Sequence, residues 1–292
     1  MLVDIGVYFT HAAAAVFGLL ILLWAVSLAA KDASLIDIFW GFGFLVVAAV
    51  CLYLSPQPTP YHWLLCGLPI LWGARLTLYL GRRNLGHGED KRYVRMRRRA
   101  ENKGMSERVW RLRTLLTVFF GQGVLIMIVS APIWIAMATG PSTELISAPP
   151  ENYEAGNTAY STHWNVLPLP GAALWLIGFL FEAIGDAQLA SFLKKNKGYN
   201  GLDDDKPVMD KGLWKYTRHP NYFGNACMWW GIWLIACQAP WGWASVFGPI
   251  IMTILLTKVS GRDLLERDLG RRKNYQDYIR RTSGFFPRPP TP

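Results

Sequence analysis

The residues best suited to chemistry lie in one short stretch, KYTRHPNYFG, at positions 215–224. It places a cation, an imidazole and an amide close together, as Arg218, His219 and Asn221. Pro220 stands among them, and the apolar run NACMWWGIWLIAC follows. Proline favours the first turn of a helix, where free backbone N–H groups attract phosphate or carboxylate. The stretch predicts an anion-binding helix start at a membrane surface, and a plain polar collar at the membrane entry is the alternative.

The composition favours an integral membrane protein over a soluble domain. The chain has 292 residues, of which 52% are hydrophobic and 17% charged, with a formal net charge of +10. The basic clusters adjoin apolar runs, so they predict cytoplasmic loops and argue against a nucleic-acid partner. The four cysteines lie in apolar runs without CxxC spacing, which predicts neither a disulfide framework nor a metal site.

Seven apolar segments approach the ~20 residues that cross a bilayer. They predict an all-α, polytopic protein with seven transmembrane helices, built as a single membrane domain over 1–292. The segments cover about 5–29, 35–54, 61–81, 114–138, 168–193, 221–238 and 241–258. A cytoplasmic helix over about 261–283 is expected after the last span.

Loop charge predicts the orientation. Residues 82–113 carry twelve Lys or Arg and residues 194–218 carry seven, whereas 139–167 carry none. By the positive-inside rule the first two segments are cytoplasmic, the N-terminus lies outside and the C-terminus inside. Most of the charge in 91–113 is that of a helix on the anionic inner leaflet, and the rest can contact an anionic cofactor.

Ionisable residues inside the predicted spans indicate a polar cavity that opens to the cytoplasm, because buried charge is costly unless it is used. They are Asp37, Arg75, Glu182 and Asp186. Glu182 and Asp186 are four residues apart and share a helix face. Asp37 can alternatively cap its helix, and Arg75 can reach the interface by snorkelling.

The C-terminal segment adds two charged residues behind the last span. Arg262 and Glu266 are four residues apart and can point back toward the cavity, or form a plain surface ion pair. The chain has no GxGxxG after a strand, no Walker A sequence, no HExxH and no nucleophile elbow. A nucleotide site would therefore have to be built from membrane helices and loops.

These motifs resemble a known family. KYTRHPNYFGNACMWWGIWLIA, followed by RDLLERDLGRRKNYQDYI, resembles the C-terminal region of the membrane steroid 5α-reductases, and is closest to their bacterial branch. SLIDIFWGFGF and WGARLTLYLGRR extend the resemblance over nearly the whole chain. The RHPNY core is also similar to that of the NADPH-using sterol C14-reductases and of the isoprenylcysteine carboxyl methyltransferases.

The resemblance implies an NADPH-dependent membrane oxidoreductase that transfers hydride to the C=C bond of an α,β-unsaturated ketone. The family's acid in the second span matches Asp37. Its tyrosine in the third span falls on Trp72, with Tyr79 the nearest phenol, so the chain departs from the family at the proton donor. Hydride addition builds charge on the carbonyl oxygen, which a carboxyl or a neighbouring phenol or indole can stabilise.

The resemblance also implies where NADPH binds. Asp186, Asn221 and Arg262 match family positions, while Glu266 stands where the animal enzymes have histidine and Asn225 where the sterol reductases have an acid. A basic site for a 2′-phosphate favours NADPH over NADH. The remaining cofactor candidates are Arg82, Arg83, Glu182, Lys194, Lys195, Tyr216, Arg218, His219 and Tyr222.

The sequence thus predicts a bacterial inner-membrane reductase whose cofactor site faces the cytoplasm. Its expected partners are the bilayer and an apolar enone, either a steroid or an isoprenoid. An S-adenosylmethionine-dependent methyltransferase acting on a lipid or an isoprenylcysteine is the alternative enzyme. A transporter is disfavoured because no paired half-repeat is visible.

Overall fold

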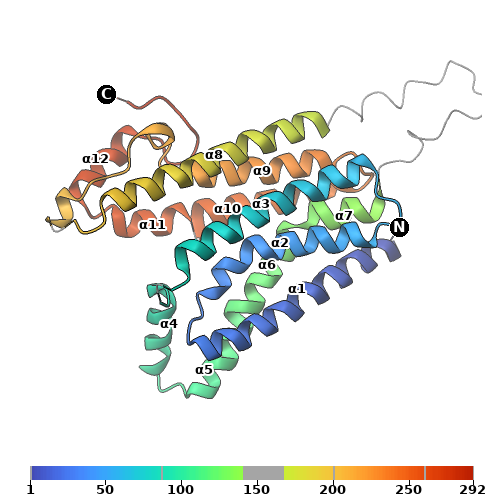
Figure 1. Cartoon of the computed structure of the whole chain (residues 1–292), viewed down its shortest axis with the longest axis horizontal. Coiled ribbons are helices and arrows are strands. Elements are labelled where there is room, and N and C mark those ends of the chain that lie inside the picture. The colour runs from blue at the N-terminus through green and yellow to red at the C-terminus, as the bar shows by residue number, and fades with distance from the viewer. Residues whose placement is uncertain (1, 87, 141–167, 200, 260, 292) are drawn as a thin grey trace, which may run out of the picture. The chain divides into compact units, whose positions relative to one another are not determined.

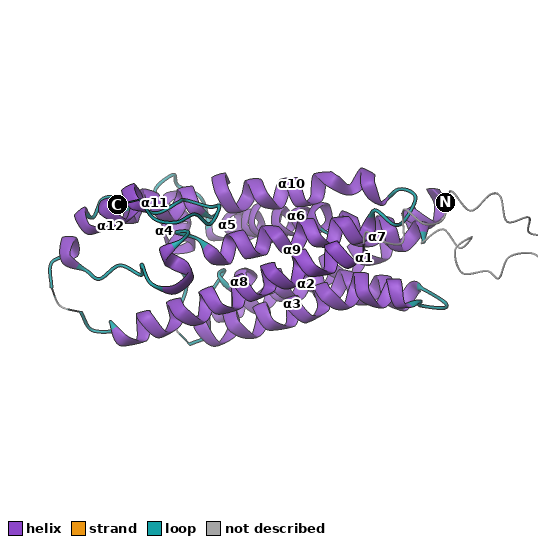
Figure 2. Cartoon of the chain, turned by 90° about the horizontal axis from the view of Figure 1, so that it is seen from above, coloured by secondary structure: helices purple, strands orange, loops and turns teal. Residues whose placement is uncertain are grey.

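The computed structural model describes residues 2–86, 88–140, 168–199, 201–259 and 261–291. Every regular element within these ranges is helical, as Figure 1 and Figure 2 show. The prediction of an all-α protein is confirmed. The predicted external loop at 139–167 lies outside the described residues from position 141 onward.

The chain divides into two compact units. The N-terminal unit comprises residues 1–165 and 236–247, and the C-terminal unit comprises 166–235 and 248–292. Each unit holds one group of the candidate site residues, and each is described by itself below. The single membrane domain over 1–292 stays a prediction.

The N-terminal unit is built around three long helices and a broken fourth. Its first helices are α1 (Leu2–Ala30), α2 (Leu35–Leu54) and α3 (Pro60–Asn84). Helices α2 and α3 cross closely because Gly41 faces Gly73: a Cβ on Gly41 would lie 2.6 Å from the Gly73 carbonyl oxygen. Two short helices, α4 (Lys91–Glu101) and α5 (Glu107–Thr114), follow α3.

The fourth predicted span, 114–138, is not one helix. A π-helical turn (Leu115–Phe120) leads from α5 into α6 (Gly121–Val129), and α7 (Ala131–Thr139) begins after a break at Ser130. Pro132 explains the break, because proline lacks the N–H of an interior helical residue and belongs in a first turn.

The C-terminal unit contains α8 (Pro168–Lys195), α9 (Pro220–Ala236) and α10 (Phe247–Ile254). Helix α9 begins at Pro220, as the sequence predicts. The segment expected as one helix over 261–283 forms two, α11 (Arg262–Leu269) and α12 (Lys273–Arg281). Gly270 ends α11, and Arg272 adopts an extended conformation that turns the chain.

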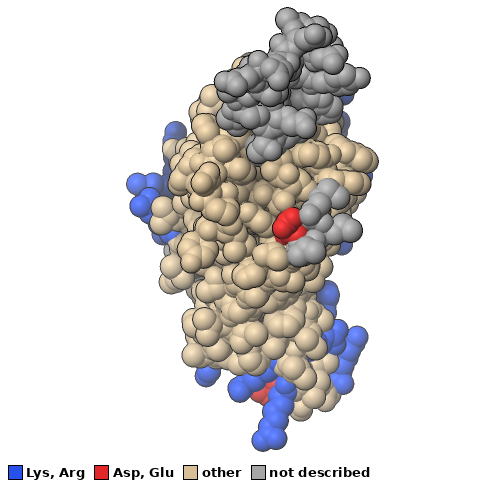
Figure 3. Space-filling model, turned by 90° about the vertical axis from the view of Figure 1, so that its right-hand side faces the viewer, with Lys and Arg blue, Asp and Glu red and all other residues tan. Residues whose placement is uncertain are grey.

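The long apolar helices indicate an integral membrane protein. Six of the described helices are long and apolar enough to cross a bilayer: 4–30, 35–54, 60–84, 107–129, 168–195 and 242–267. Helix α9 has 17 residues, roughly 25 Å at 1.5 Å per residue, which is less than a ~30 Å hydrocarbon core. The face seen in Figure 3 is mostly tan, with an acidic patch within it and Lys and Arg side chains mainly at its margins. The count of seven spans, which requires α9 to cross the bilayer, and the orientation stay predictions.

Candidate functional site

Asp37 is the centre of a polar cluster in the N-terminal unit. It lies in the first turn of α2, and its side chain is 19% exposed. Its Oδ2 accepts from Arg92 Nη2 at 2.6 Å, and its Oδ1 accepts from the Tyr93 hydroxyl at 2.8 Å. Ser34 occupies the cap position of α2. The Asp37 carboxylate therefore links α2 to α4 and does not cap its own helix.

Local contacts hold α4 against this end of α2. Glu89 accepts from the Ala33 backbone N–H at 3.0 Å and from Arg97 Nη2 at 2.9 Å. Asp90 caps α4 by accepting from the Arg92 N–H at 2.8 Å. The segment before α4 is thus bonded to the α1–α2 turn, which carries the start of α4 to Asp37.

Tyr93 supplies the phenol beside Asp37. Its side chain is buried, with 7% exposure, and burial together with the neighbouring Asp37 carboxylate raises the pKa of Tyr93 well above its usual range. The hydroxyl is therefore protonated at neutral pH and can donate. The sequence analysis does not identify Tyr93, because the many Lys and Arg residues of 91–113 indicate a membrane-surface helix. The one sequence feature that could have indicated Tyr93 is that it is a tyrosine directly after the basic residues Lys91 and Arg92.

The two aromatic residues predicted beside Asp37 contact other side chains. Trp72 is buried, with its ring centroid 5.6 Å from that of Phe44. The Tyr79 ring lies 5.7 Å from the guanidinium carbon of Arg75 and equally far from that of Arg83. The catalytic roles of Trp72 and Tyr79 stay predictions, while the phenol bonded to Asp37 is Tyr93.

Glycines position the second group of residues, in the C-terminal unit. Helix α8 places Gly171, Gly178 and Gly185 seven residues apart, and α9 places Gly224 and Gly231 with the same spacing. A Cβ on Gly171 would lie 2.8 Å from the Gly231 carbonyl oxygen. A side chain at Gly171, Gly178, Gly224 or Gly231 would push α8 and α9 apart, as at the small-residue interfaces of membrane helices.

This seam brings buried carboxylates of α8 against amides of α9. Glu182 Oε2 accepts from Asn225 Nδ2 at 3.0 Å, and Asp186 Oδ1 accepts from Asn221 Nδ2 at 3.2 Å. The carboxylate residues are 3% and 5% exposed. Glu182 and Asp186 therefore share a helix face, as their spacing predicts. We call these four residues the carboxylate–amide ladder.

One acceptor in the ladder is unused. Asn225 is 8% exposed, and its Oδ1 has no hydrogen-bond partner among the described residues. A buried acceptor without a partner costs about 1–3 kcal/mol. A bound group with an N–H or O–H would remove that cost. In the sequence analysis Asn225 is noted only because the sterol reductases have an acidic residue at that position.

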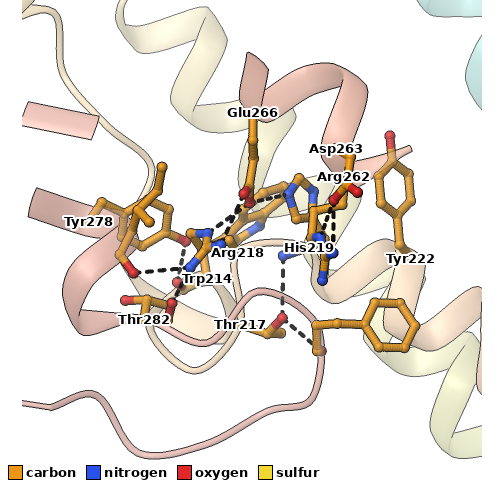
Figure 4. Close-up of polar contacts among 12 residues, drawn as sticks. Trp214, Thr217, Arg218, His219, Tyr222, Arg262, Asp263, Glu266, Tyr278 and Thr282 are labelled. Carbon is orange, nitrogen blue, oxygen red and sulfur yellow. Dashed lines mark hydrogen bonds and ion pairs between the residues drawn. The ribbon is translucent and has the colours of Figure 1, made fainter. Parts of the chain in front are cut away.

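Arg218 is held by the protein on every nitrogen of its guanidinium (Figure 4). Its Nε and Nη2 donate to the two oxygens of Glu266 at 2.7 and 2.9 Å. Its Nη1 donates to the carbonyl of Ile279 at 3.1 Å and to that of Thr282. This geometry favours a structural role, and the phosphate contact predicted for Arg218 stays a prediction.

His219 shares the same carboxylate. Its Nε2 lies 2.9 Å from Glu266 Oε1, and its ring stacks on that of Tyr222 with centroids 5.1 Å apart. Burial lowers the pKa of His219, against the opposing effect of Glu266. The imidazole is therefore neutral at pH 7, and its Nε2–H donates to Glu266.

Glu266 and Arg262 do not form the pair that their spacing allows. Glu266 bonds Arg218 and His219, while Arg262 Nη2 lies 2.8 Å from the adjacent Asp263 (Figure 4). Arg262 remains partly exposed. It is thus a more accessible cation than Arg218.

The other predicted cofactor residues lie at helix ends. Lys194 and Lys195 are exposed at the end of α8, and Arg82 and Arg83 are exposed at the end of α3 in the N-terminal unit. Tyr216 is also exposed, and its carbonyl accepts from the Arg288 N–H at 2.9 Å. Their predicted contacts with NADPH stay predictions.

Comparison with known proteins gives two findings. Residues 23–282 match the family described as "Protein of unknown function (DUF1295)". An uncharacterised protein of Schizosaccharomyces pombe is 24% identical over 238 residues, which are 74% of this chain and 61% of that protein. The chain thus matches less than two thirds of that relative's length. No solved structure matches the chain.

The matched region contains both residue groups described above. It runs from the end of α1 to the end of α12, and so includes Asp37, Tyr93 and the carboxylate–amide ladder. The chain belongs to the DUF1295 family, which is associated with steroid 5-alpha-reductase-like membrane proteins.

Proposed function

We propose that this protein is a membrane reductase that uses NADPH to reduce the C=C bond of an α,β-unsaturated ketone in an apolar substrate. The substrate class is a steroid or an isoprenoid. The observation that carries the proposal is the 2.8 Å hydrogen bond between Asp37 and the buried Tyr93 hydroxyl. A phenol held by a carboxylate is a proton and hydrogen-bond donor, which enone reduction needs and methyl transfer to a lipid does not.

The residues of this cluster have distinct parts in the reaction. NADPH, when bound, supplies a hydride to the β-carbon. The carbonyl oxygen would then gain negative charge. The single Tyr93 hydroxyl proton, which is donated to Asp37 in this structure, would turn toward that oxygen and donate to it. A proton taken from solvent water would then add to the α-carbon and complete the saturated ketone, so one hydride and one proton are consumed. Asp37 keeps the phenol oriented, and Arg92 holds the other oxygen of Asp37.

The carboxylate–amide ladder fits the cofactor in the chemistry of its groups. The unpartnered Asn225 Oδ1 is an acceptor for an amide N–H or a ribose hydroxyl, and Asn221 and Asp186 offer further polar atoms. Exposed Lys and Arg side chains supply positive charge to bind the phosphates of the cofactor. We assign that part to Lys194, Lys195 and Arg262, which belong to the same unit as the ladder.

The identity of the cofactor is tested by measuring the thermal stability of the detergent-purified protein with different ligands. A ligand that binds the folded state raises the melting temperature according to its concentration over its dissociation constant. NADPH, but neither NADH nor S-adenosylmethionine, should stabilise the protein. Stabilisation by S-adenosylmethionine alone would reassign the protein to methyl transfer, and no stabilisation by NADPH would refute the cofactor assignment.

A pair of matched variants tests the donor. Tyr93→Phe removes the hydroxyl at Asp37, whereas Tyr79→Phe removes a hydroxyl from α3. Turnover is followed as the loss of NADPH absorbance with a steroid enone. Tyr93→Phe should lower turnover about 10²–10⁴-fold, the usual contribution of a positioned proton donor, and Tyr79→Phe should retain it. The reverse pattern would return the role to Tyr79.

A further inference from the structure

Helix α4 has one face that is packed against the protein and another that is exposed and basic. Tyr93, Arg97 and Ala100 are four and three residues apart, so they share the face that packs on the N-terminal unit; Tyr93 and Ala100 are buried. Lys91, Arg95 and Arg98 repeat the same spacing on another face and are exposed. The basic surface thus lies on the opposite side of α4 from Tyr93.

The arginines of this basic surface form no ion pair with a described carboxylate, although Asp90 interacts electrostatically with Arg95 at longer range. Within the described part of the chain, the ion pairs of α4 are those of Arg92 and Arg97. No described carboxylate lies within 4.0 Å of a nitrogen of Arg95, Arg98 or Arg99. Like charges this close repel one another, so an external anion would stabilise the folded helix.

The surface belongs to the boundary between membrane and water. Helix α5 follows α4 after a short turn, and the apolar helical run 107–129 begins with it. Its Val109 and Leu112 side chains are 54% and 57% exposed. Trp24, near the end of α1, donates from Nε1 to the Arg111 carbonyl at 3.2 Å. Exposed apolar residues, a tryptophan and arginines together are typical of the membrane interface.

We propose that Lys91, Arg95, Arg98 and Arg99 of α4 bind anionic phospholipid headgroups. Lysine and arginine near a membrane surface are attracted to anionic lipids, and each residue adds to the attraction. The opposite face of the same helix carries Tyr93 to Asp37 (Figure 1 shows α4). Anionic lipid therefore holds α4 in the position in which its phenol reaches the α2 carboxylate. The proposal does not depend on the reductase reaction.

Full-length protein in phosphatidylcholine nanodiscs, with and without phosphatidylglycerol, tests this. Phosphatidylglycerol should raise the melting temperature and slow amide hydrogen exchange in 91–101. Both effects should shrink at ~1 M salt, where the screening length falls to about 3 Å. Inorganic phosphate added to phosphatidylcholine discs should not reproduce them, because it lacks the bilayer's surface concentration of charge.

Two triple variants separate a local site from a general effect of charge. Arg95→Gln, Arg98→Gln and Arg99→Gln together remove the basic face and leave Arg92 and Tyr93 in place. Lys211→Gln, Lys215→Gln and Arg271→Gln remove as many exposed cations from the C-terminal unit. The lipid-dependent shift and exchange protection should be lost in the first variant and kept in the second. Equal responses in both, or no response in the wild type, would overturn the proposal.

Discussion

The carboxylate of Glu266 in α11 receives the Arg218 guanidinium through two hydrogen bonds, Nε–Oε1 at 2.7 Å and Nη2–Oε2 at 2.9 Å. The same Oε1 lies 2.9 Å from His219 Nε2. The motif before α9 is thus fixed by a residue 48 positions later in the chain. Backbone contacts extend this clasp, because the Arg218 N–H donates to the Ser283 carbonyl at 2.9 Å.

Breaking this pair should destabilise the C-terminal unit. Glu266→Gln leaves the buried Arg218 without its counter-ion, which costs about 3 kcal/mol of unfolding free energy for a buried pair. Asp277→Asn removes an exposed pair with Arg280 and should cost less than about 1 kcal/mol. Denaturant unfolding measures both. Equal, small effects would show that the Arg218–Glu266 pair contributes little to stability.

Asp37→Asn should separate chemistry from cofactor binding. The amide keeps the shape of the carboxylate but loses the charge that holds Arg92 and orients Tyr93. We expect turnover of an enone to fall at least about 10²-fold, while the NADPH-dependent rise in melting temperature remains. Full activity in this variant would remove Asp37 from the proposed mechanism.

The unused acceptor of Asn225 predicts a ligand contact. Asn225→Leu should weaken NADPH binding about tenfold, or about 1.4 kcal/mol, by removing one hydrogen bond. Asn274, which also has a buried Oδ1 without a partner, provides the control. Asn274→Leu should change the stability of the unliganded protein but leave the NADPH-dependent shift unchanged. Calorimetric titration with NADPH measures the two affinities, and an unchanged affinity in Asn225→Leu would contradict the contact.

The glycine seam predicts a site of low tolerance. Gly178→Val places branched carbons against α9, where a Cβ alone would lie 2.8 Å from the Met228 nitrogen. Overpacking of this kind costs about 1–3 kcal/mol. Gly67→Val in α3 adds the same side chain where nothing lies within 4 Å of the Cβ. The difference between the melting temperatures of the two variants measures the cost of crowding the α8–α9 contact. Equal decreases in melting temperature would indicate an effect of helix propensity alone.

Stability should fall on mild acidification because of His219. Burial lowers the pKa of His219 in the folded protein below its ordinary value of 6.5, so the unfolded chain binds a proton first as pH falls. The contribution of this group is complete above pH 6.5 and declines below it, by at most about 1.4 kcal/mol per pH unit. Melting temperatures between pH 8 and pH 5, measured for wild type and His219→Gln, check this. A variant with the same pH dependence would exclude His219 as the cause.

Local sequence patterns predict the helical class, the membrane character and the start of α9. Those features depend on apolar length, on proline and on local charge, which act within one segment. The sequence also showed that Glu182 and Asp186 share a helix face, since that requires only a spacing of four residues. What it could not show was which residues of distant segments meet.

The partners of the charged groups come from the tertiary structure. It gave Asp37 a phenol from α4, and it gave Glu266 to Arg218 and His219 and not to Arg262. Both results follow from how helices pack: the glycine contacts and the backbone bonds of the loops bring together side chains that are far apart in the sequence. Contacts of this kind depend on shape across the whole unit, which no local pattern of charge or hydropathy specifies.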